Sequence, residues 1–415
     1  MSGLASEPFN TALREASTER QRGSAVSGLN IMTVYGTRPE AIKMAPLIAG
    51  LRDHPDLHPV VAVTGQHRVM LDQVNHLFGV TPDYDMDLMR SGATLSQLTS
   101  RILTATSDLF AATRPDAVVV QGDTSSAFSA ALAAFYQQIP VIHLEAGLRT
   151  GDMYSPFPEE ANRRLTAPLA KLHLAPTPTS RQNLEHEGID PAIIAVTGNT
   201  VIDALQATAR RAVEFTDPRV AAAVGAGSRI LLVTCHRRES WGEKMAEIMR
   251  AVHTIGEKHP ELQIVLPMHR NVIVREVIEN ELGGMDNILL TEPLMYHEFT
   301  HVLQAAHLVL TDSGGVQEEA PSLGKPVLVM RDTTERPEAV LAGTVLLVGT
   351  GGAAIVRETL TLLEDDRAHL AMANAVNPYG DGRAAARSVA AIALMFGLGE
   401  RLPDFDPSRL TPPGE

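Results

Sequence analysis

The sequence predicts an α/β protein with two Rossmann-like domains. Between residues 29 and 398, short runs of β-branched residues alternate with helical patterns, and almost every run ends on a polar residue. Strands that alternate with helices are typical of βαβ units and parallel sheets. Polar strand ends fit this class, because open α/β sheets bind ligands outside the carboxyl ends of their strands. The eleven runs are too many for one convenient doubly wound sheet, so we expect two domains.

The chain begins with a polar stretch of small residues that lacks the apolar segment of a signal peptide. We therefore interpret residues 1–28 as a disordered N-terminal extension outside the fold. The first domain is predicted over residues 29–198. Its strands are expected at "NIMTVYG", "PVVAVTG", "DAVVVQG", "PVIHLEAG" and "IIAVTGN", separated by helical patterns such as "AIKMAPLIAGLR", "TLSQLTSRILTATSDLF" and "SAALAAFYQQ".

The second domain is predicted over residues 199–380. A helical pattern and the loose segment "VGAGS" (224–228) follow "VTGN", which places the domain boundary near residue 199. Strands are expected at "RILLVTCH", "LQIVLPMH", "NILLTEP", "LVLTDSG", "KPVLVMR" and "TVLLVG". Residues 381–398 form a further helical pattern, and residues 399–415 are predicted to be a flexible tail.

The composition is that of an ordinary soluble globular protein, with 44% hydrophobic and 20% charged residues. A net charge of −14 argues against general nucleic-acid binding. The single cysteine, Cys235, cannot form an internal disulfide and fits a reducing compartment, so we expect a cytoplasmic protein. No apolar run approaches 18 residues, so membrane insertion is not expected.

Seven predicted strand ends carry polar side chains, and two domains facing each other would focus them on one cleft. These ends are Gly36-Thr37-Arg38 (with Lys43 one turn later), Gln66-His67, Gln121-Gly122-Asp123, His143 with Glu145, His236-Arg237-Arg238, His269-Arg270 and Ser313-Gly314-Gly315. The cations suit a diphosphate, and the carboxylates suit sugar hydroxyls or proton transfer. Together they predict a nucleotide sugar as ligand, although any single arginine or glutamate is more commonly part of a surface ion pair.

The segment "LVLTDSGGVQEEA" (308–320) is predicted to be a strand that opens onto a phosphate-binding turn. Glycines at 314 and 315 would allow a phosphate to approach the backbone closely, and the new helix would offer unpaired N–H groups. Glu318 and Glu319 follow within one helical turn, so a sugar hydroxyl is the expected partner for them. Alternatively, the segment is a tight turn followed by a solvated helix face.

Four segments resemble the non-hydrolysing UDP-N-acetylglucosamine 2-epimerases of bacteria. They are "VYGTRPEAIKMAPL", "QGDTSSAFSAALAAFYQQIPVIHLEAGLRTGDMYSPFPEEANRR", "HRRESWGE" and "LTDSGGVQEEAPSLGKPVLVMRDTTERPEAV". The resemblance implies a GT-B-type arrangement of the two domains, with the active site in the interdomain cleft. It also implies a helix at 381–398 that crosses back to the first domain, and a homodimer. That family interconverts UDP-GlcNAc and UDP-ManNAc by anti elimination of UDP, giving 2-acetamidoglucal, followed by re-addition. The product would supply ManNAc units for surface polysaccharide.

The resemblance also implies roles for individual residues. The catalytic residues implied are Asp123, Glu145, Glu159 and His236. The implied substrate-binding residues are Arg38, Lys43, Ser313, Gly314, Gly315, Glu319, Arg336 and Phe299. A second UDP-GlcNAc, acting as an allosteric activator, would bind at Gln66 and His67, although Val69 stands where relatives often carry a polar residue. No metal and no cofactor are implied.

The chemistry explains why these residue types are needed. The C2 hydrogen of a sugar is not acidic, but it becomes removable once the C1–O bond breaks and an oxocarbenium-like centre forms. One carboxylate can stabilise that cation and another can take the proton, while a cation stabilises the leaving diphosphate. We therefore expect Asp123, Glu145 and Glu159 to converge on one sugar. No intact G-x-G-x-x-G or Walker A motif occurs, so no nicotinamide is expected.

Other functions fit parts of the sequence. A hydrolysing epimerase or a GT-B glycosyltransferase would use a similar site, and a binding protein that has lost catalysis would keep some of it. The segment "HEFTHVLQAAH" (297–307) has the H-E-x-x-H spacing of zinc hydrolases, but it lies inside a predicted βαβ unit and lacks the glycine of the extended motif. Cys235 precedes His236, yet adjacent strand residues point to opposite faces, which argues against a Cys–His dyad.

Overall fold

A computed structural model describes residues 9, 11–13, 15, 28–65, 68–90, 92–237 and 240–410. The chain divides into two compact units. Unit 1 comprises Met1–Ala204 and Gly382–Asp406, and unit 2 comprises Leu205–Asp381 and Pro407–Glu415. Each unit contains a parallel sheet with helices, which confirms the predicted α/β class with two domains. The division falls inside helix α8 (Thr200–Ala209), a few residues after the predicted boundary.

Unit 1 is built on a seven-stranded parallel sheet with the order β3-β2-β1-β4-β5-β6-β7. The strands are β1 (Leu29–Tyr35), β2 (Leu57–Val63), β3 (Tyr84–Asp85), β4 (Ala117–Gln121), β5 (Val141–Leu144), β6 (Leu172–Ala175) and β7 (Ile194–Val196). Most residues of β1 and all residues of β4 are buried, as expected for strands covered on both faces. The strand order reverses between β1 and β4, so their carboxyl ends form the switch point at which such sheets bind ligands.

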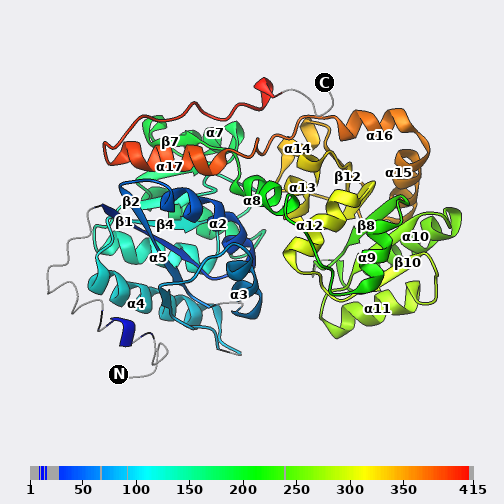
Figure 1. Ribbon diagram of the computed structural model, residues 1–415, viewed down its shortest axis with the longest axis horizontal. Coiled ribbons are helices and arrows are strands. Elements are labelled where there is room, and N and C mark those ends of the chain that lie inside the picture. Colours follow the sequence, from blue (N-terminus) through cyan, green and yellow to red (C-terminus); the bar gives the residue numbers. More distant parts are fainter. Residues whose placement is uncertain are drawn as a thin grey trace. The chain divides into compact units, whose positions relative to one another are not determined.

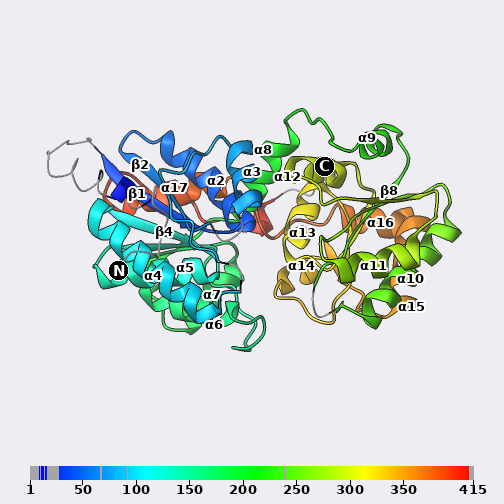
Figure 2. The same ribbon diagram turned by 90° about the horizontal axis from the view of Figure 1, so that it is seen from below.

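Helices cover both faces of this sheet. They are α2 (Arg38–Arg52), α3 (Arg68–Leu77), α4 (Leu95–Thr113), α5 (Ser125–Tyr136), α6 (Glu159–Thr166), α7 (Pro178–His186), α8 and α17 (Ala384–Met395). Figures 1 and 2 show α2, α3 and α17 on one face and α4, α5 and α6 on the other. Helix α17 packs against α2, so residues near the end of the chain complete the fold of unit 1.

Unit 2 is built on a six-stranded parallel sheet with the order β10-β9-β8-β11-β12-β13. The strands are β8 (Ile230–Thr234), β9 (Gln263–Pro267), β10 (Ile288–Thr291), β11 (Leu308–Thr311), β12 (Val327–Val329) and β13 (Val345–Leu347). The strand order reverses between β8 and β11, which pair directly. The carboxyl ends of these two strands therefore form the switch point of unit 2.

The helices of unit 2 also lie on both faces of the sheet. They are α9 (Pro218–Gly225), α10 (Glu243–Lys258), α11 (Val272–Leu282), α12 (Tyr296–Ala305), α13 (Gly314–Glu319), α14 (Pro337–Leu341), α15 (Gly352–Glu364) and α16 (Asp366–Ala373). Helix α10 packs against α11 and α15 on one face, and α12 and α13 lie on the other (Figures 1 and 2). None of the helices in the described part of the chain is both long enough and apolar enough to cross a membrane.

Two strands of unit 1 are absent from the sequence prediction. Strand β3 has two residues, too few to give a pattern. Strand β6 has the sequence "LHLA", which contains no β-branched residue and places a histidine in the middle of a buried run. The segment is a strand because it pairs with β5 on one side and β7 on the other. These pairings are with distant segments, so the local sequence does not indicate them.

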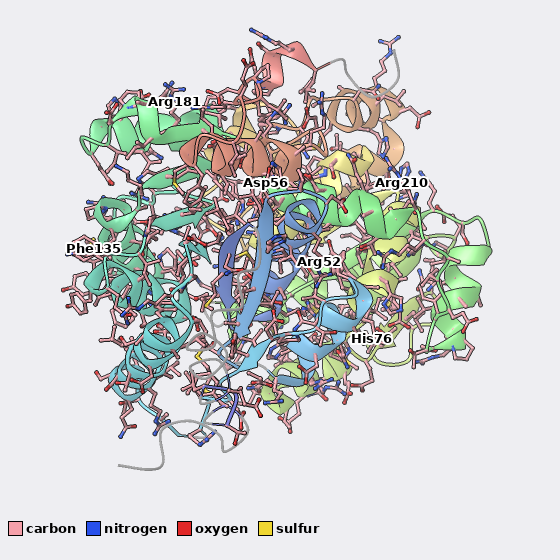
Figure 3. All side chains as sticks on the ribbon, turned by 60° about the vertical axis from the view of Figure 1, so that its left-hand side comes forward. Arg52, Asp56, His76, Phe135, Arg181 and Arg210 are labelled. Atoms are coloured by element: carbon pink, nitrogen blue, oxygen red, sulfur yellow. The ribbon has the colours of Figure 1, made fainter. Side chains whose placement is uncertain are left out.

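The prediction of a flexible tail over residues 399–415 is wrong for its first part, because residues 404 and 405 bind strand β7. The carboxylate of Asp404 accepts a hydrogen bond from the Val196 backbone N–H (3.0 Å) and another from Arg181 (3.0 Å), which is labelled in Figure 3. The Phe405 backbone N–H donates to the Val196 carbonyl (2.8 Å), and the Phe405 ring is buried. The segment thus covers the edge strand of the sheet. Most of the predicted disordered extension, residues 1–28, lies outside the described residues, but the prediction is wrong at Phe9, which is buried in the core of unit 1.

Two buried histidines should lower the free energy of unfolding of the protein in acid. Burial lowers the pKa of His173 on β6 to about 3 and that of His143 on β5 to about 4. Both stay neutral in the folded chain while the unfolded chain takes up protons below about pH 6.5, so stability falls as the pH falls. Each should cost about 2 kcal/mol between pH 7 and pH 5.

His173→Leu is expected to remove about 2 kcal/mol of this pH dependence, measured as the difference between the free energies of unfolding in urea at pH 7 and pH 5. Neither ring nitrogen of His173 has a hydrogen-bond partner in the described part of the chain, so the leucine breaks no hydrogen bond there. The exposed His76, changed to glutamine, is the control and should leave the dependence intact. An unchanged pH dependence in His173→Leu would show that another group titrates.

Candidate active site

Glu145 lies next to the switch point of unit 1 and is held by three side-chain donors. It follows β5, is buried, and has a backbone φ of 63°, which is uncommon for a residue other than glycine. Lys43 and Gln121 both donate to its carboxylate at short range, and Asn199 Nδ2 donates to Oε1 at 2.9 Å. Such a backbone conformation costs about 1 kcal/mol or more and persists where the surroundings enforce it. The sequence therefore places a carboxylate held by three hydrogen bonds here, at the expense of backbone strain.

Asp123 follows β4 and lies beside helix α6. Its Oδ2 accepts hydrogen bonds from Arg163 Nε (2.8 Å) and Nη2 (2.6 Å), and its backbone carbonyl accepts one from Asn162 Nδ2 (2.8 Å). The side chain of Asp123 is 24% exposed, so it can still reach a ligand. Gly122, with φ 66°, brings the two strand ends together, because a Cβ at this position would lie 3.3 Å from Glu145 Oε2.

Helix α6 contributes the third predicted carboxylate at its first residue, the half-buried Glu159. The next residue, Glu160, has a structural role: it is fully buried, accepts from the backbone N–H groups of Thr150 (3.1 Å) and Gly151 (3.3 Å), and pairs with Arg163. Asp123 follows β4, Glu145 follows β5 and Glu159 begins α6. Lys43 faces Glu145 and Arg163 faces Asp123, so these two carboxylates each have a cationic partner.

The turn after β1 positions the two predicted cations of unit 1. Thr37 caps helix α2 in a capping box with Glu40, and Arg38 and Lys43 are on the first turns of this helix. Glu40 Oε2 accepts from the Gly36 and Thr37 backbone N–H groups (3.0 and 2.7 Å), and Oε1 accepts from Thr124 (2.7 Å). Glu40 therefore joins the ends of β1 and β4, which flank the switch point.

In unit 2, His236 and Asp312 form a pair at the carboxyl ends of β8 and β11. His236 Nδ1 lies 3.0 Å from Asp312 Oδ1, and the backbone N–H groups of His236 and Arg237 donate to Asp312 Oδ2 at 2.7 and 2.8 Å. Asp312 is fully buried, whereas the His236 side chain is 44% exposed. Burial raises the pKa of Asp312, but the hydrogen bond and charge of His236 and the two backbone N–H groups outweigh it, so this pKa lies below its usual value.

A histidine that donates Nδ1–H to a buried carboxylate presents Nε2 to a ligand. Asp312 thus fixes the orientation of His236, a role that the sequence prediction missed. Cys235 does not assist this histidine. It is buried, and burial together with the neighbouring Asp312 raises its pKa well above the usual value for a thiol, so it is a poor nucleophile.

The turn at 313–315 begins helix α13, with Ser313 at the N-cap position. Ser313 N–H donates to Thr311 Oγ1 at 2.9 Å. Gly314 lies against Arg336, because a Cβ at Gly314 would be 2.5 Å from Arg336 Nη1. A Cβ at Gly315 would meet only Glu319 Oε2, at 3.9 Å. The packing of Arg336 therefore requires glycine at position 314. Open space at the start of the helix exists only at Gly315.

The remaining predicted substrate contacts lie on helices α12, α13 and α14. Glu319 Oε1 accepts a hydrogen bond from Tyr296 Oη at 2.9 Å, and both side chains are buried. Phe299 is half-buried on the same helix as Tyr296. Arg336 precedes α14 and donates from Nε to Glu318 at 2.6 Å. Glu318 is therefore the partner of Arg336, whereas Glu319 faces helix α12.

The two glycines give a test of what the turn does. Gly314→Ala is expected to lower the free energy of unfolding by about 1–3 kcal/mol, since Arg336 cannot retreat without breaking its contact with Glu318. Gly315→Ala is expected to leave stability nearly unchanged and to weaken UDP binding, if phosphate approaches this backbone. Urea unfolding and calorimetry of the two variants check this. Equal stability loss in both would contradict the packing argument.

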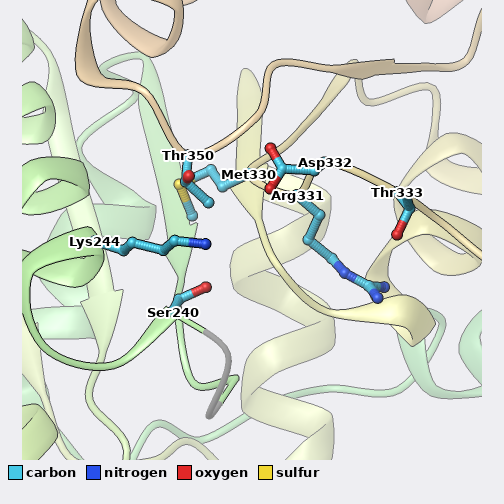
Figure 4. Close-up of a pocket in the computed structure, with 7 residues that line it drawn as sticks. All are labelled: Ser240, Lys244, Met330, Arg331, Asp332, Thr333 and Thr350. Carbon is cyan, nitrogen blue, oxygen red and sulfur yellow. The ribbon is translucent and has the colours of Figure 1, made fainter. Parts of the chain in front are cut away.

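Beyond these side chains, unit 2 has a cavity of about 210 Å³ next to the carboxyl ends of its strands. It is lined by Ser240, Lys244, Met330, Arg331, Asp332, Thr333 and Thr350. In Figure 4 the ammonium of Lys244 and the hydroxyl of Ser240 lie on one side, and the side chain of Arg331 points away from them. Arg331 instead donates to Glu335 at 2.9 Å.

The structure also places residues that the sequence left open. Gln66 and His67, the predicted allosteric pair, lie outside the described residues. The three histidines of the H-E-x-x-H segment do not converge. His301 places its ring nitrogens 2.8 Å from the carbonyls of His297 and Arg211, and His307 stacks on His369 at 4.0 Å. No group of three metal-ligating side chains occurs in the part of the chain that the structure describes.

Comparison with known proteins covers most of the chain. The family described as UDP-N-acetylglucosamine 2-epimerase matches residues 49–393. The chain is 53% identical over 372 residues to a probable UDP-N-acetylglucosamine 2-epimerase of Ralstonia nicotianae, which covers 88% of this chain and 99% of that protein. It is 51% identical over 369 residues to the UDP-N-acetylglucosamine 2-epimerase of Escherichia coli K12, with 88% and 98% covered.

Solved structures are similar over the same span. The S. aureus MnaA–UDP co-structure matches with a TM-score of 0.85 and 44% identity, and covers 91% of this chain and 100% of that one. The crystal structure of UDP-GlcNAc 2-epimerase from Neisseria meningitidis bound to UDP-GlcNAc matches with a TM-score of 0.82 and 45% identity, and covers 89% and 100%.

Proposed function

The chain belongs to the UDP-N-acetylglucosamine 2-epimerase family, and from this premise we propose that it interconverts UDP-GlcNAc and UDP-ManNAc at C2 without hydrolysis. The observation that carries the proposal is the buried Glu145 carboxylate, which Lys43, Gln121 and Asn199 hold in a strained backbone conformation beside Asp123. An arrangement that costs stability to fix carboxylates at a switch point fits acid–base chemistry on a sugar.

The reaction assigns sugar chemistry to unit 1. The C1–O bond breaks and its electron pair leaves with UDP, while a carboxylate takes the C2 proton and the C2–H electron pair forms the C1–C2 double bond of 2-acetamidoglucal. Re-addition of UDP to C1 and delivery of a proton to the opposite face of C2 give the epimer. Asp123, Glu145 and Glu159 are the candidate proton carriers and cation stabilisers, since two faces of C2 must be served.

Leaving-group chemistry is assigned to unit 2. The diphosphate gains negative charge as the C1–O bond breaks, and hydrogen-bond donors aimed at it lower the barrier. His236, oriented by Asp312, is the proposed donor. The turn at 313–315 and Arg336 are the proposed diphosphate site, and Glu319 is the proposed contact to the ribose. Arg38 and Lys43 of unit 1 are proposed as further UDP contacts.

Incubation with UDP-GlcNAc in heavy water tests the proposal directly. We expect nuclear magnetic resonance to detect UDP-ManNAc that carries deuterium at C2. Free UDP and sugar as the final products would instead indicate a hydrolysing epimerase. Transfer of the sugar to an acceptor would indicate a glycosyltransferase. Retention of the original C2 hydrogen in UDP-ManNAc would rule out elimination and favour an oxidation–reduction route.

We further propose that UDP-GlcNAc activates its own turnover through Gln66 and His67. Turnover of pure UDP-ManNAc should then lag until a little UDP-GlcNAc is added, and full-rate turnover without a lag would contradict this. The same proposal includes a cytoplasmic homodimer that needs no cofactor and supplies ManNAc units for surface polysaccharide.

A further inference from the structure

Two buried side chains of unit 2, Tyr296 and Glu319, form a hydrogen bond between helices α12 and α13 (Figure 1). Tyr296 Oη donates to Glu319 Oε1 at 2.9 Å, and each residue is only 7% exposed. Tyr296 is the first residue of α12, and Glu319 is the last residue of α13. The bond therefore fixes one oxygen of a buried carboxylate at the junction of the two helices.

The start of α12 holds Tyr296 in place. Glu298 accepts the Met295 backbone N–H at Oε2 (2.9 Å) and the Thr216 backbone N–H at Oε1 (2.5 Å). This buried glutamate thus caps α12 and ties it to the segment before α9. The Tyr296 carbonyl accepts a hydrogen bond from Thr300 Oγ1 at 2.9 Å within the helix. The tyrosine is therefore a donor whose position is set by its own helix.

The second oxygen of Glu319 lies toward the turn at 313–315. A Cβ at Gly315 would be 3.9 Å from Glu319 Oε2. The neighbouring Glu318 points to another side of α13, where it pairs with Arg336. A carboxylate beside the proposed diphosphate site is repelled by the phosphates. This repulsion is offset when the same ligand donates a hydrogen bond to the carboxylate, because hydrogen bonds to charged acceptors are strong.

A nucleoside diphosphate carries such a donor next to its phosphates. Its ribose is bonded directly to the first phosphate, and the two ribose hydroxyls can donate hydrogen bonds. A glutamate side chain has several rotatable bonds, so an untethered carboxylate would lose rotamer freedom when it binds a hydroxyl. The Tyr296 bond removes this freedom before the ligand arrives, which lowers the cost of ordering the carboxylate on binding.

We propose that Tyr296 is a positioning residue that holds Glu319 in the orientation in which it accepts a hydrogen bond from the ribose. The pair would then select nucleotides that carry ribose hydroxyls over those that lack them. This inference rests on the proposed function, since it takes UDP as the ligand and Glu319 as the ribose contact. A tyrosine with only a structural role would affect all uridine nucleotides alike, whereas a positioning residue acts only on ligands that carry the hydroxyls.

Tyr296→Phe tests the proposal, because it keeps the buried ring and removes only the hydroxyl. Calorimetry compares UDP with 2′,3′-dideoxy-UDP, which lacks both ribose hydroxyls. The unaltered protein should bind UDP about tenfold or more tightly than the dideoxy ligand, the scale of a hydrogen bond to a charged group. In Tyr296→Phe we expect the UDP affinity to fall by about tenfold, while the affinity for dideoxy-UDP stays unchanged.

Tyr35→Phe is the matched control. Tyr35 Oη donates to Asn75 Oδ1 at 2.9 Å within unit 1, so this variant also loses a buried tyrosine hydrogen bond of the same length. It should keep the ratio of the two affinities. A double-mutant cycle completes the test. Once Glu319 is replaced by alanine, Tyr296→Phe should not change that ratio further, because a residue that acts only through another has no effect in its absence.

Three results would overturn the proposal: equal affinities of the unaltered protein for UDP and dideoxy-UDP, an unchanged ratio in Tyr296→Phe, or a further fall of the ratio when Tyr296→Phe is added to Glu319→Ala. The proposed function is tested separately, by formation of UDP-ManNAc in the unaltered protein. A protein that binds UDP through its ribose without epimerising UDP-GlcNAc would keep this inference and lose the proposed function, so the two failures are distinct.

Discussion

Glu145→Gln and Asp123→Asn are each expected to lower turnover of UDP-GlcNAc by about a hundredfold or more, the scale of a lost acid–base group. Both substitutions keep the size of the side chain. In Glu145→Gln the amide can still accept hydrogen bonds from Lys43 and Asn199, and a rotated Gln121 amide can accept from the new N–H group. In Asp123→Asn the amide oxygen can still accept from Arg163. The fold should therefore survive while the charge at the reacting carbons is lost.

A measurement of UDP affinity distinguishes a loss of catalysis from a loss of binding in these variants. Calorimetry should give UDP affinities within a few-fold of the unaltered protein, since removing one negative charge does not remove a proposed diphosphate contact. The control is Asp116→Asn, at the opposite end of β4, where Asp116 accepts a hydrogen bond from the Asn30 backbone N–H (2.8 Å). It should lower stability by about 1 kcal/mol and leave turnover intact. Near-normal turnover in both Glu145→Gln and Asp123→Asn would show that other carboxylates do the chemistry.

Several parts of the site could be predicted because parallel sheets place function at their strand ends. Arg38, Asp123, Glu145, His236 and Ser313 each lie at or just after the end of a strand that the sequence also predicts. Within unit 1 the reversal of strand order lies between β1 and β4, and within unit 2 it lies between β8 and β11, so each unit has its own group of polar strand ends. A run of β-branched residues followed by a polar residue is a local pattern, so a single sequence is enough to recognise it.

The partners of these residues could not be predicted, since they come from distant segments. Asn199 reaches Glu145 from beyond β7, and Arg163 reaches Asp123 from α6. Asp312 directly follows β11 and precedes the glycine pair, so its position at a strand end was a signal in the sequence that it belongs to the candidate site. What the sequence did not indicate was that this side chain turns toward the loop after β8 instead of toward a ligand.

The glycine pair illustrates a different limit. Both glycines fit a phosphate turn in the sequence, yet the structure gives Gly314 an internal neighbour, the Arg336 guanidinium. The docked segment that contains Phe405 shows the same limit, since a polar C-terminal region with four prolines in residues 399–415 gives no local sign of the β7 edge that it covers. Contacts of this kind depend on which surfaces the rest of the fold leaves uncovered.

Asp312→Asn is expected to lower turnover by about a hundredfold or more, through its effect on His236. The aspartate accepts two backbone N–H groups at Oδ2, so the oxygen of an asparagine would take that position and its amide N–H would face His236 Nδ1. His236 would then have to accept at Nδ1 and carry its proton on Nε2. A His236 that donates to the diphosphate from Nε2 while it keeps a proton on Nδ1 is the charged form, and this form would lose its carboxylate partner.

Two measurements distinguish this effect from a loss of packing. Nitrogen-15 resonances of His236 should show a proton on Nδ1 in the unaltered protein and no proton on Nδ1 in Asp312→Asn. In a double-mutant cycle, Asp312→Asn should cost little further turnover once His236 is replaced by asparagine, because a residue that acts only through another has no effect in its absence. If the two losses multiply instead, Asp312 contributes independently of His236. The buried carboxylate would then serve the loop after β8 through its backbone hydrogen bonds, and His236 would have to find its orientation elsewhere.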